Sequence, residues 1–84
     1  MRVHVRLFAS LRDRFPANAR GRGEVELASD ATLEDLIEQL AIPDRLAQMV
    51  LVDGQQAPRK KGERVHVILS EGQTVSIFPP VSGG

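Results

Sequence analysis

Apolar and polar residues alternate at the start of the chain, which is typical of a strand covered on one face. In the segment 2–8 the apolar positions are Val3, Val5 and Leu7, with polar residues between them. These three side chains are expected to face the core. The segment 24–28 alternates in the same way, so we expect it to return against the first strand as a wide hairpin.

The residues between these two segments combine a short helical pattern with a turn pattern. Ser10 can cap a short helix in which Leu11 and Phe15 pair at i and i+4. Pro16 and the glycines of the segment 20–23 then enforce a turn. We therefore expect a mobile loop that contains one short helix.

The middle of the chain has the spacing of a helix with one apolar side. Its apolar residues recur at i, i+3, i+4 and i+7, namely Leu33, Leu36, Ile37 and Leu40. Thr32 followed by Asp35 approximates a capping box, and Pro43 ends the helix. Glu34, Asp35 and Glu38 fall outside the apolar stripe, so these acids are expected on a solvated face.

Three further strands are expected in the second half of the chain, over 49–53, 65–69 and 74–78. The first of them stops at the turn pattern Asp53-Gly54. The order is then strand, strand, helix, strand, strand, strand, without internal repeats or a long linker. This order indicates an α+β fold in which one main helix covers one face of a sheet.

Length and composition narrow the class of protein. Eighty-four residues, 42% of them apolar, suit one small domain. The sequence contains no cysteine, which excludes a disulfide scaffold, a cysteine-ligated zinc and a thiol nucleophile. No apolar run approaches the ~20 residues that span a bilayer, and the first residues do not resemble a signal peptide. We expect a soluble, cytoplasmic protein without a membrane partner.

Charge is balanced overall but unevenly distributed. Eleven basic and eleven acidic residues give a net charge of zero, so a nucleic-acid partner is not expected. Residues 1–23 carry a net charge of +5 and residues 24–58 a net charge of −7, whereas residues 73–84 have no charged side chain. The basic segment 59–64 is expected to be a solvated loop, with partner binding as the alternative.

The side chains offer little for catalysis or metal binding. His4 and His66 are both flanked by valines in strand patterns and are expected to point away from the core, without a second ligand at i+2 or i+4. Gly21 and Gly23 do not belong to a phosphate-binding motif. The chain is therefore expected to bind no metal and no cofactor, and to have no catalytic side chains of its own.

The C-terminus differs from the rest of the chain. It reads Phe78-Pro79-Pro80-Val81-Ser82-Gly83-Gly84. The two prolines remove backbone donors and favour an extended chain, so we expect residues 79–84 to project from a domain formed by residues 1–78. Two terminal glycines can enter a narrow channel on a partner enzyme. The reactive group is then the terminal carboxylate of Gly84.

These features resemble the MoaD/ThiS family of ubiquitin-like sulfur carriers, and within it the small subunit of molybdopterin synthase. The resemblance covers nearly the whole chain and rests on the segments 5–12, 32–36 and 50–54 and on the tail. It implies a β-grasp fold with a mixed sheet of four to five strands. In that fold the first and last strands are parallel neighbours at the centre and the helix crosses the sheet.

The resemblance also implies a reaction sequence and partners. A ubiquitin-activating-type adenylyltransferase would use ATP to adenylate Gly84, and a sulfur donor enzyme would replace AMP to leave a thiocarboxylate. The large subunit of molybdopterin synthase, in a heterotetramer, would receive the tail and supply the catalytic side chains. This chain would then be a non-catalytic subunit and co-substrate.

Two alternatives remain open. The same carrier chemistry could serve another pathway, such as the synthesis of thiamine thiazole or cysteine, or tRNA thiolation. The chain could instead be a protein modifier that is joined through Gly84 to lysines, as ubiquitin is. Both alternatives require the same adenylated diglycine.

Phe8 and Phe78 are the candidate anchors for a partner. Alternation places both rings on the sheet face away from the helix, and parallel first and last strands would bring them to the same end of the sheet, beside the tail. The alternative is that Phe8 turns under the short helix into a side core. The predicted partner-binding residues are Phe8, Phe78, Pro79, Pro80, Val81, Ser82 and Gly83.

Overall fold

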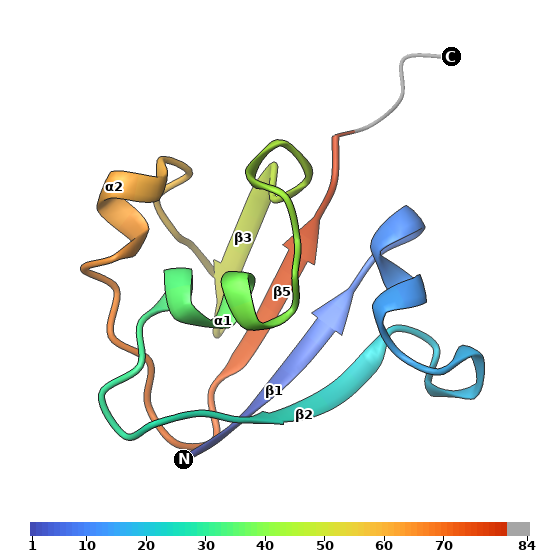
Figure 1. Cartoon of the computed structure of the whole chain (residues 1–84), viewed down its shortest axis with the longest axis horizontal. Coiled ribbons are helices and arrows are strands. Elements are labelled where there is room, and N and C mark those ends of the chain that lie inside the picture. Colours follow the sequence, from blue (N-terminus) through green and yellow to red (C-terminus); the bar gives the residue numbers. More distant parts are fainter. Residues whose placement is uncertain (81–84) are drawn as a thin grey trace.

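The computed structural model describes residues 1–80, whose strands form one five-stranded sheet (Figure 1). The strands are β1 (Arg2–Leu7), β2 (Arg22–Glu26), β3 (Met49–Val52), β4 (Gln55–Gln56) and β5 (Thr74–Phe78). They lie in the order β2-β1-β5-β3-β4, with β1 and β5 parallel and the other neighbours antiparallel. This is the β-grasp arrangement that the sequence predicts, including the parallel pair formed by the first and last strands.

Helix α1 (Leu33–Gln39) crosses one face of the sheet, and a shorter helix α2 (Lys61–Arg64) precedes the return into β5 (Figure 1). Three 3-10 helices complete the described elements: η1 (Ala9–Arg14), η2 (Ala17–Ala19) and η3 (Asp44–Leu46). Strands β1, β2, β3 and β5 and helix α1 contribute side chains to one hydrophobic core.

The predicted capping box starts α1. The Thr32 hydroxyl accepts a hydrogen bond from the Asp35 backbone N–H at 3.2 Å, and the Asp35 carboxylate accepts one from the Thr32 backbone N–H at 2.9 Å. Leu33, Leu36 and Ile37 are buried against the sheet. The apolar stripe and its cap therefore orient the helix as the sequence predicts.

Alternation also places the core residues of the central strands correctly. Val3, Val5 and Leu7 from β1 are all buried, as are Val75 and Ile77 from β5. Because these strands are parallel neighbours, the five side chains form one continuous apolar layer beneath α1.

The hairpin is confirmed, but two of its details are wrong in the prediction. The second strand runs from Arg22 to Glu26 and not over 24–28, because its ladder follows β1 and that strand spans only residues 2–7. Ser10 does not cap the short helix. That helix is of the 3-10 type and begins directly after Phe8, with the Leu11 N–H donating to the Phe8 carbonyl.

The strand predicted over 65–69 is also wrong. Residues 61–64 form α2, and Ile68 makes only an isolated bridge with Thr32. Two physical reasons account for this. Strand β4 already pairs with the free edge of β3. The buried Arg64 side chain also forms ion pairs with Glu34 and Asp44.

Candidate functional site

Two aromatic rings mark the end of the sheet from which the chain leaves β5. The rings of Phe8 and Phe78 are stacked, with centroids 4.1 Å apart and planes inclined by 11°. Leu7 and Ile77 are register partners in the parallel pair, and this pairing brings the two following residues together. The predicted meeting of Phe8 and Phe78 at one end of the sheet is confirmed.

Neither ring of this pair belongs to the hydrophobic core. Both are half-buried, and the core packing that includes Phe15 does not include them. The alternative in which Phe8 turns into a side core is therefore wrong. Stacked aromatics outside the core form an apolar surface that a partner could cover.

A groove extends this apolar surface toward the start of the tail. We call it the aromatic groove, and it is lined by Phe8, Ala9, Ser10, Gln48, Met49, Gln56, Arg59, Phe78, Pro79 and Pro80. Met49 is the register partner of Phe78 and is 38% exposed. The apolar surface therefore extends from the stacked rings to Met49 on β3. Pro79 and Pro80, which follow β5, line the same groove.

Arg59 forms the polar wall of the aromatic groove. Its guanidinium donates a hydrogen bond of 2.8 Å to the Gln48 side-chain oxygen. This contact joins the segment before α2 to the segment before β3. The groove therefore has a charged rim beside an apolar floor, an arrangement common in protein interfaces.

The described part of the tail is Pro79, which is half-buried, and Pro80, which is exposed. Both line the aromatic groove, and their role in partner binding stays a prediction. Val81, Ser82, Gly83 and Gly84 lie outside the described residues. Their predicted roles, and the division into a domain of residues 1–78 and a tail of residues 79–84, remain predictions.

Sequence reasoning missed the ion pairs that the buried Arg64 side chain forms. Arg64 is fully buried, and its Nε donates to the Glu34 carboxylate at 2.9 Å while its Nη2 donates to Asp44. Glu34 is only 5% exposed. The prediction of a solvated face is therefore wrong for Glu34, and that of a solvated basic loop is wrong for Arg64. Each residue has its partner far away in the sequence, so local pattern could not show the pair.

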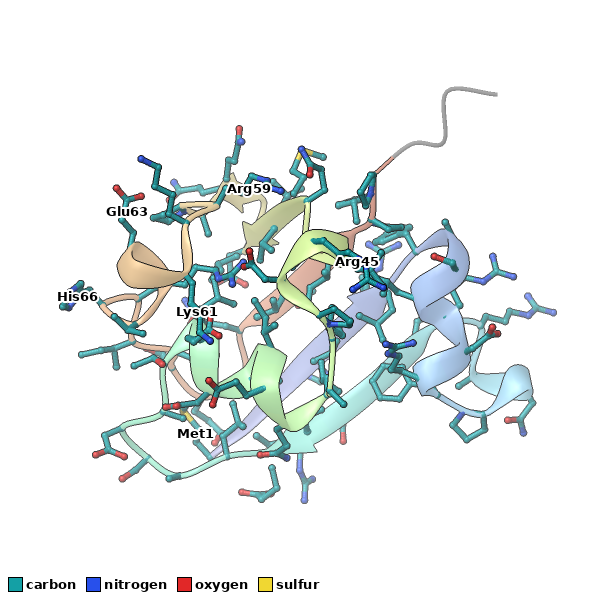
Figure 2. All side chains as sticks on the ribbon, turned by 45° about the horizontal axis from the view of Figure 1, so that its top comes forward. Met1, Arg45, Arg59, Lys61, Glu63 and His66 are labelled. Carbon is teal, nitrogen blue, oxygen red and sulfur yellow. The ribbon has the colours of Figure 1, made fainter. Side chains whose placement is uncertain are left out.

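Other polar side chains in and after α2 lie at the surface. Figure 2 shows Glu63 and His66 pointing away from the molecule, and both are exposed. His4 is exposed as well, as expected from its position in the first strand.

Within residues 1–80, no group of three or more histidines and acids could hold a metal ion. No helix among these residues is long and apolar enough to cross a membrane.

The five-stranded mixed sheet and the helix that crosses it form the β-grasp fold of ubiquitin-like proteins. The ThiS family model matches residues 5–84, so the chain belongs to the ThiS family. This assignment makes it one of the family's small carrier proteins, which are not enzymes themselves.

Individual relatives point in the same direction. Small archaeal modifier protein 3 of Haloferax volcanii is 34% identical over 97 aligned positions, covering 100% of both chains. The crystal structure of SAMP1 from Haloferax volcanii has a TM-score of 0.70 at 21% identity, again covering 100% of both chains. A complex of subunits 1 and 2 of the molybdopterin-converting factor from Helicobacter pylori has a TM-score of 0.62 at 21% identity, with the same coverage.

These comparisons confirm the family predicted from the tail and the opening strand. They do not establish the narrower resemblance to the small subunit of molybdopterin synthase. The relative at 34% identity is a modifier protein, and the structural likeness at 21% identity concerns the fold. The class shown is a ThiS-type sulfur carrier or small archaeal modifier.

Proposed function

We propose that this chain is a ubiquitin-like carrier that acts through the terminal carboxylate of Gly84. The observation that carries the proposal is the uncharged diglycine tail, which follows directly from the aromatic groove at Phe78 and Pro79. The family match extends through the tail to residue 84, which supports the same reading.

The proposed chemistry begins with activation of a poor electrophile. A Gly84 carboxylate oxygen attacks the α-phosphorus of ATP on an adenylating enzyme, which forms the acyl-adenylate and releases pyrophosphate. A sulfur nucleophile at the oxidation level of sulfide then attacks the acyl carbon and displaces AMP, leaving a thiocarboxylate. Glycine suits both steps because it has no side chain to obstruct a narrow active site.

A second fate of the same acyl-adenylate is conjugation to a lysine. The amine attacks the acyl carbon, directly or after transfer of the acyl group to a thiol, and an isopeptide bond forms. The similarity to small archaeal modifier protein 3 over the whole chain favours this fate. The protein would then be a modifier as well as a sulfur carrier.

The third candidate is the small subunit of molybdopterin synthase. The tail sequence Phe78-Pro79-Pro80-Val81-Ser82-Gly83-Gly84 favours it. The large subunit would cover the aromatic groove and draw the tail into its own active site. An acceptor enzyme that co-purifies with the chain would distinguish this pathway from other sulfur-transfer pathways.

The fates can be separated by mass spectrometry. The chain incubated with the adenylating enzyme, ATP and a sulfur donor should exchange one oxygen for one sulfur. Conjugation should instead yield branched peptides after trypsin digestion. Because trypsin cleaves after lysine and arginine and Arg64 is the last of these, the branch would be the peptide 65–84 attached to a lysine. If neither product forms with a cognate adenylating enzyme, the proposed function is wrong.

A further inference from the structure

The exposed face of the β1–β2 hairpin carries a ladder of polar cross-strand pairs. From the start of β1 the pairs are Arg2 with Glu26, His4 with Glu24 and Arg6 with Arg22. In the first pair Arg2 Nε lies 3.5 Å from a Glu26 carboxylate oxygen, and in the second His4 Nδ1 lies 3.4 Å from Glu24. The third pair instead sets two arginines against each other.

Both acids of this ladder, Glu24 and Glu26, lie within 4.0 Å of nitrogen atoms of basic groups. The Met1 ammonium lies 3.1 Å from the Glu26 carboxylate, and this contact, with a smaller contribution from Arg2, holds the pKa of Glu26 below its usual value. Glu26 is therefore ionised and paired at neutral pH. The charge of the ladder is balanced at one end of the hairpin and unbalanced at the other.

Two more arginines join the unbalanced end. Arg6, Arg12, Arg20 and Arg22 line one shallow depression, and we call this set the arginine cluster. All four residues are exposed, and within residues 1–80 none has a carboxylate within 4.0 Å. Like charges directly opposite each other on paired strands are destabilising, so this arrangement costs stability in the isolated chain.

The cluster is partly held in place by the backbone. Gly21 has a φ of +77°, and a Cβ there would lie 2.8 Å from Arg12 Cγ and 2.3 Å from the Leu7 carbonyl oxygen. The aliphatic part of Arg12 therefore rests on a glycine surface that only glycine can provide. This contact keeps the Arg12 side chain beside the Arg6–Arg22 pair.

The arginine cluster adjoins the aromatic groove. Phe8 lines both depressions, and the Arg6 guanidinium lies 5.5 Å from the centre of the Phe8 ring. A partner that covers the stacked rings would reach the cluster without a break. The two surfaces therefore suit one continuous interface with an apolar part and an anionic part.

We propose that the arginine cluster docks an acidic surface on the adenylating enzyme that activates Gly84, next to the part of that enzyme that covers the aromatic groove. This inference rests on the proposed function and adds the electrostatic half of the recognition. A carrier must reach and leave its activating enzyme repeatedly, and complementary charge increases the association rate while leaving the complex reversible.

A protein surface fits the arginine cluster better than a nucleic acid does. The chain has zero net charge, and Glu24 and Glu26 follow Arg22 on the same strand and the same face. A phosphate backbone that continues along the hairpin would meet these carboxylates. A compact acidic patch on a protein meets only the four arginines.

The test is the equilibrium affinity of the full chain for the purified adenylating enzyme, measured without ATP at low and at moderate salt. The double variant Arg6→Glu/Arg22→Glu preserves a like-charge pair in the hairpin but inverts its sign. It should bind at least tenfold more weakly at low salt, and its affinity should depend less on salt than that of the wild type.

The matched control is Arg45→Glu/Lys60→Glu, which changes the net charge equally. Both control positions are exposed and lie outside the arginine cluster, and Figure 2 shows Arg45 on the segment between α1 and β3. This variant should bind within about twofold of the wild type, because its altered charges lie outside the proposed interface.

The single variant Arg22→Glu supplies a readout that a structural role would not give. It converts the Arg6–Arg22 pair into a complementary pair, so its melting temperature should rise by a few degrees. Its affinity for the adenylating enzyme should nevertheless fall. A cluster that served only the fold would show no such opposition between stability and binding.

Three results of the binding measurements would overturn this inference. The first is an affinity of the Arg6→Glu/Arg22→Glu variant equal to that of the control. The second is absence of binding between the wild-type chain and the enzyme. The third is arginine-dependent binding of the wild type to RNA and not to the enzyme. If the enzyme modifies Gly84 equally well in every variant, the proposed function stands and the docking inference fails. If binding to the enzyme depends on the arginines but Gly84 is not modified, the docking inference stands and the proposed function fails.

Discussion

The contacts of Phe15 and Phe78 indicate different roles for these two side chains. Phe15 packs against the core, and its ring lies so close to Gly23 that a Cβ there would approach it to 2.7 Å. Phe78 is also half-buried, but it stacks on Phe8 outside the core. Two phenylalanines of similar exposure therefore have different expected functions, one in stability and one in binding.

Replacing Phe78 should affect binding more than stability. The Phe78→Ala variant loses one ring of the stacked pair, and we expect its affinity for the adenylating enzyme to fall about tenfold or more. Its melting temperature should change little. The control Phe15→Ala should lower the free energy of unfolding by about 2–4 kcal/mol without a specific loss of affinity. Unchanged affinity together with a strongly lowered melting temperature for Phe78→Ala would show that Phe78 is a core residue.

Replacing Arg64 should show that its burial depends on the acids around it. The Arg64→Met variant leaves the buried Glu34 carboxylate with only the Lys61 ammonium, 4.0 Å away, so we expect a loss of about 3–5 kcal/mol in the free energy of unfolding. The double variant Arg64→Met/Glu34→Leu should recover most of this loss, because no buried charge is then unpaired. Urea unfolding of both variants measures the difference. Equal stability of the single variant and the wild type would contradict the role assigned to the pair.

At the scale of elements, the sequence predicts best the strands and the helix that have one apolar face and one polar face. The alternation in β1 and β5 and the capped stripe of α1 are decided locally, and the structure confirms them. The segment 65–69 has strand-like composition, yet it lies outside the sheet because β4 takes the edge beside β3. That competition between distant segments is not visible in a local pattern.

The turn before β2 should be the element least tolerant of a side chain. Gly21→Ala places a Cβ 2.3 Å from the Leu7 carbonyl oxygen at a φ of +77°, so we expect a loss of about 1–3 kcal/mol in stability. Gly62, in α2, has open space around its Cβ position. The control Gly62→Ala should be neutral or more stable by about 0.5–1 kcal/mol. Thermal unfolding that gives the opposite order would contradict this description of the turn.

At the scale of the whole molecule, the candidate site is only partly visible in the sequence. The position of Phe8 beside Phe78 could be predicted from alternation together with the parallel strands that the family resemblance implies. Met49, Gln48 and Arg59 complete the aromatic groove from segments distant in the sequence, and no local pattern identifies them. The arginine cluster was equally hidden, because the net charge of +5 in residues 1–23 does not reveal that β1 and β2 pair Arg6 with Arg22.

The central claim is that the chain acts through the carboxylate of Gly84. The residues of the hydrophobic core all fall between positions 3 and 77 of the sequence, so the core does not include Gly84. The most direct test is the intact mass of the wild type and of a variant that lacks Gly84, each after incubation with the adenylating enzyme, ATP and a sulfur donor. The wild type should exchange one oxygen for one sulfur. The variant should not, while its melting temperature stays close to that of the wild type. Exchange in both proteins, or in neither, would contradict the account.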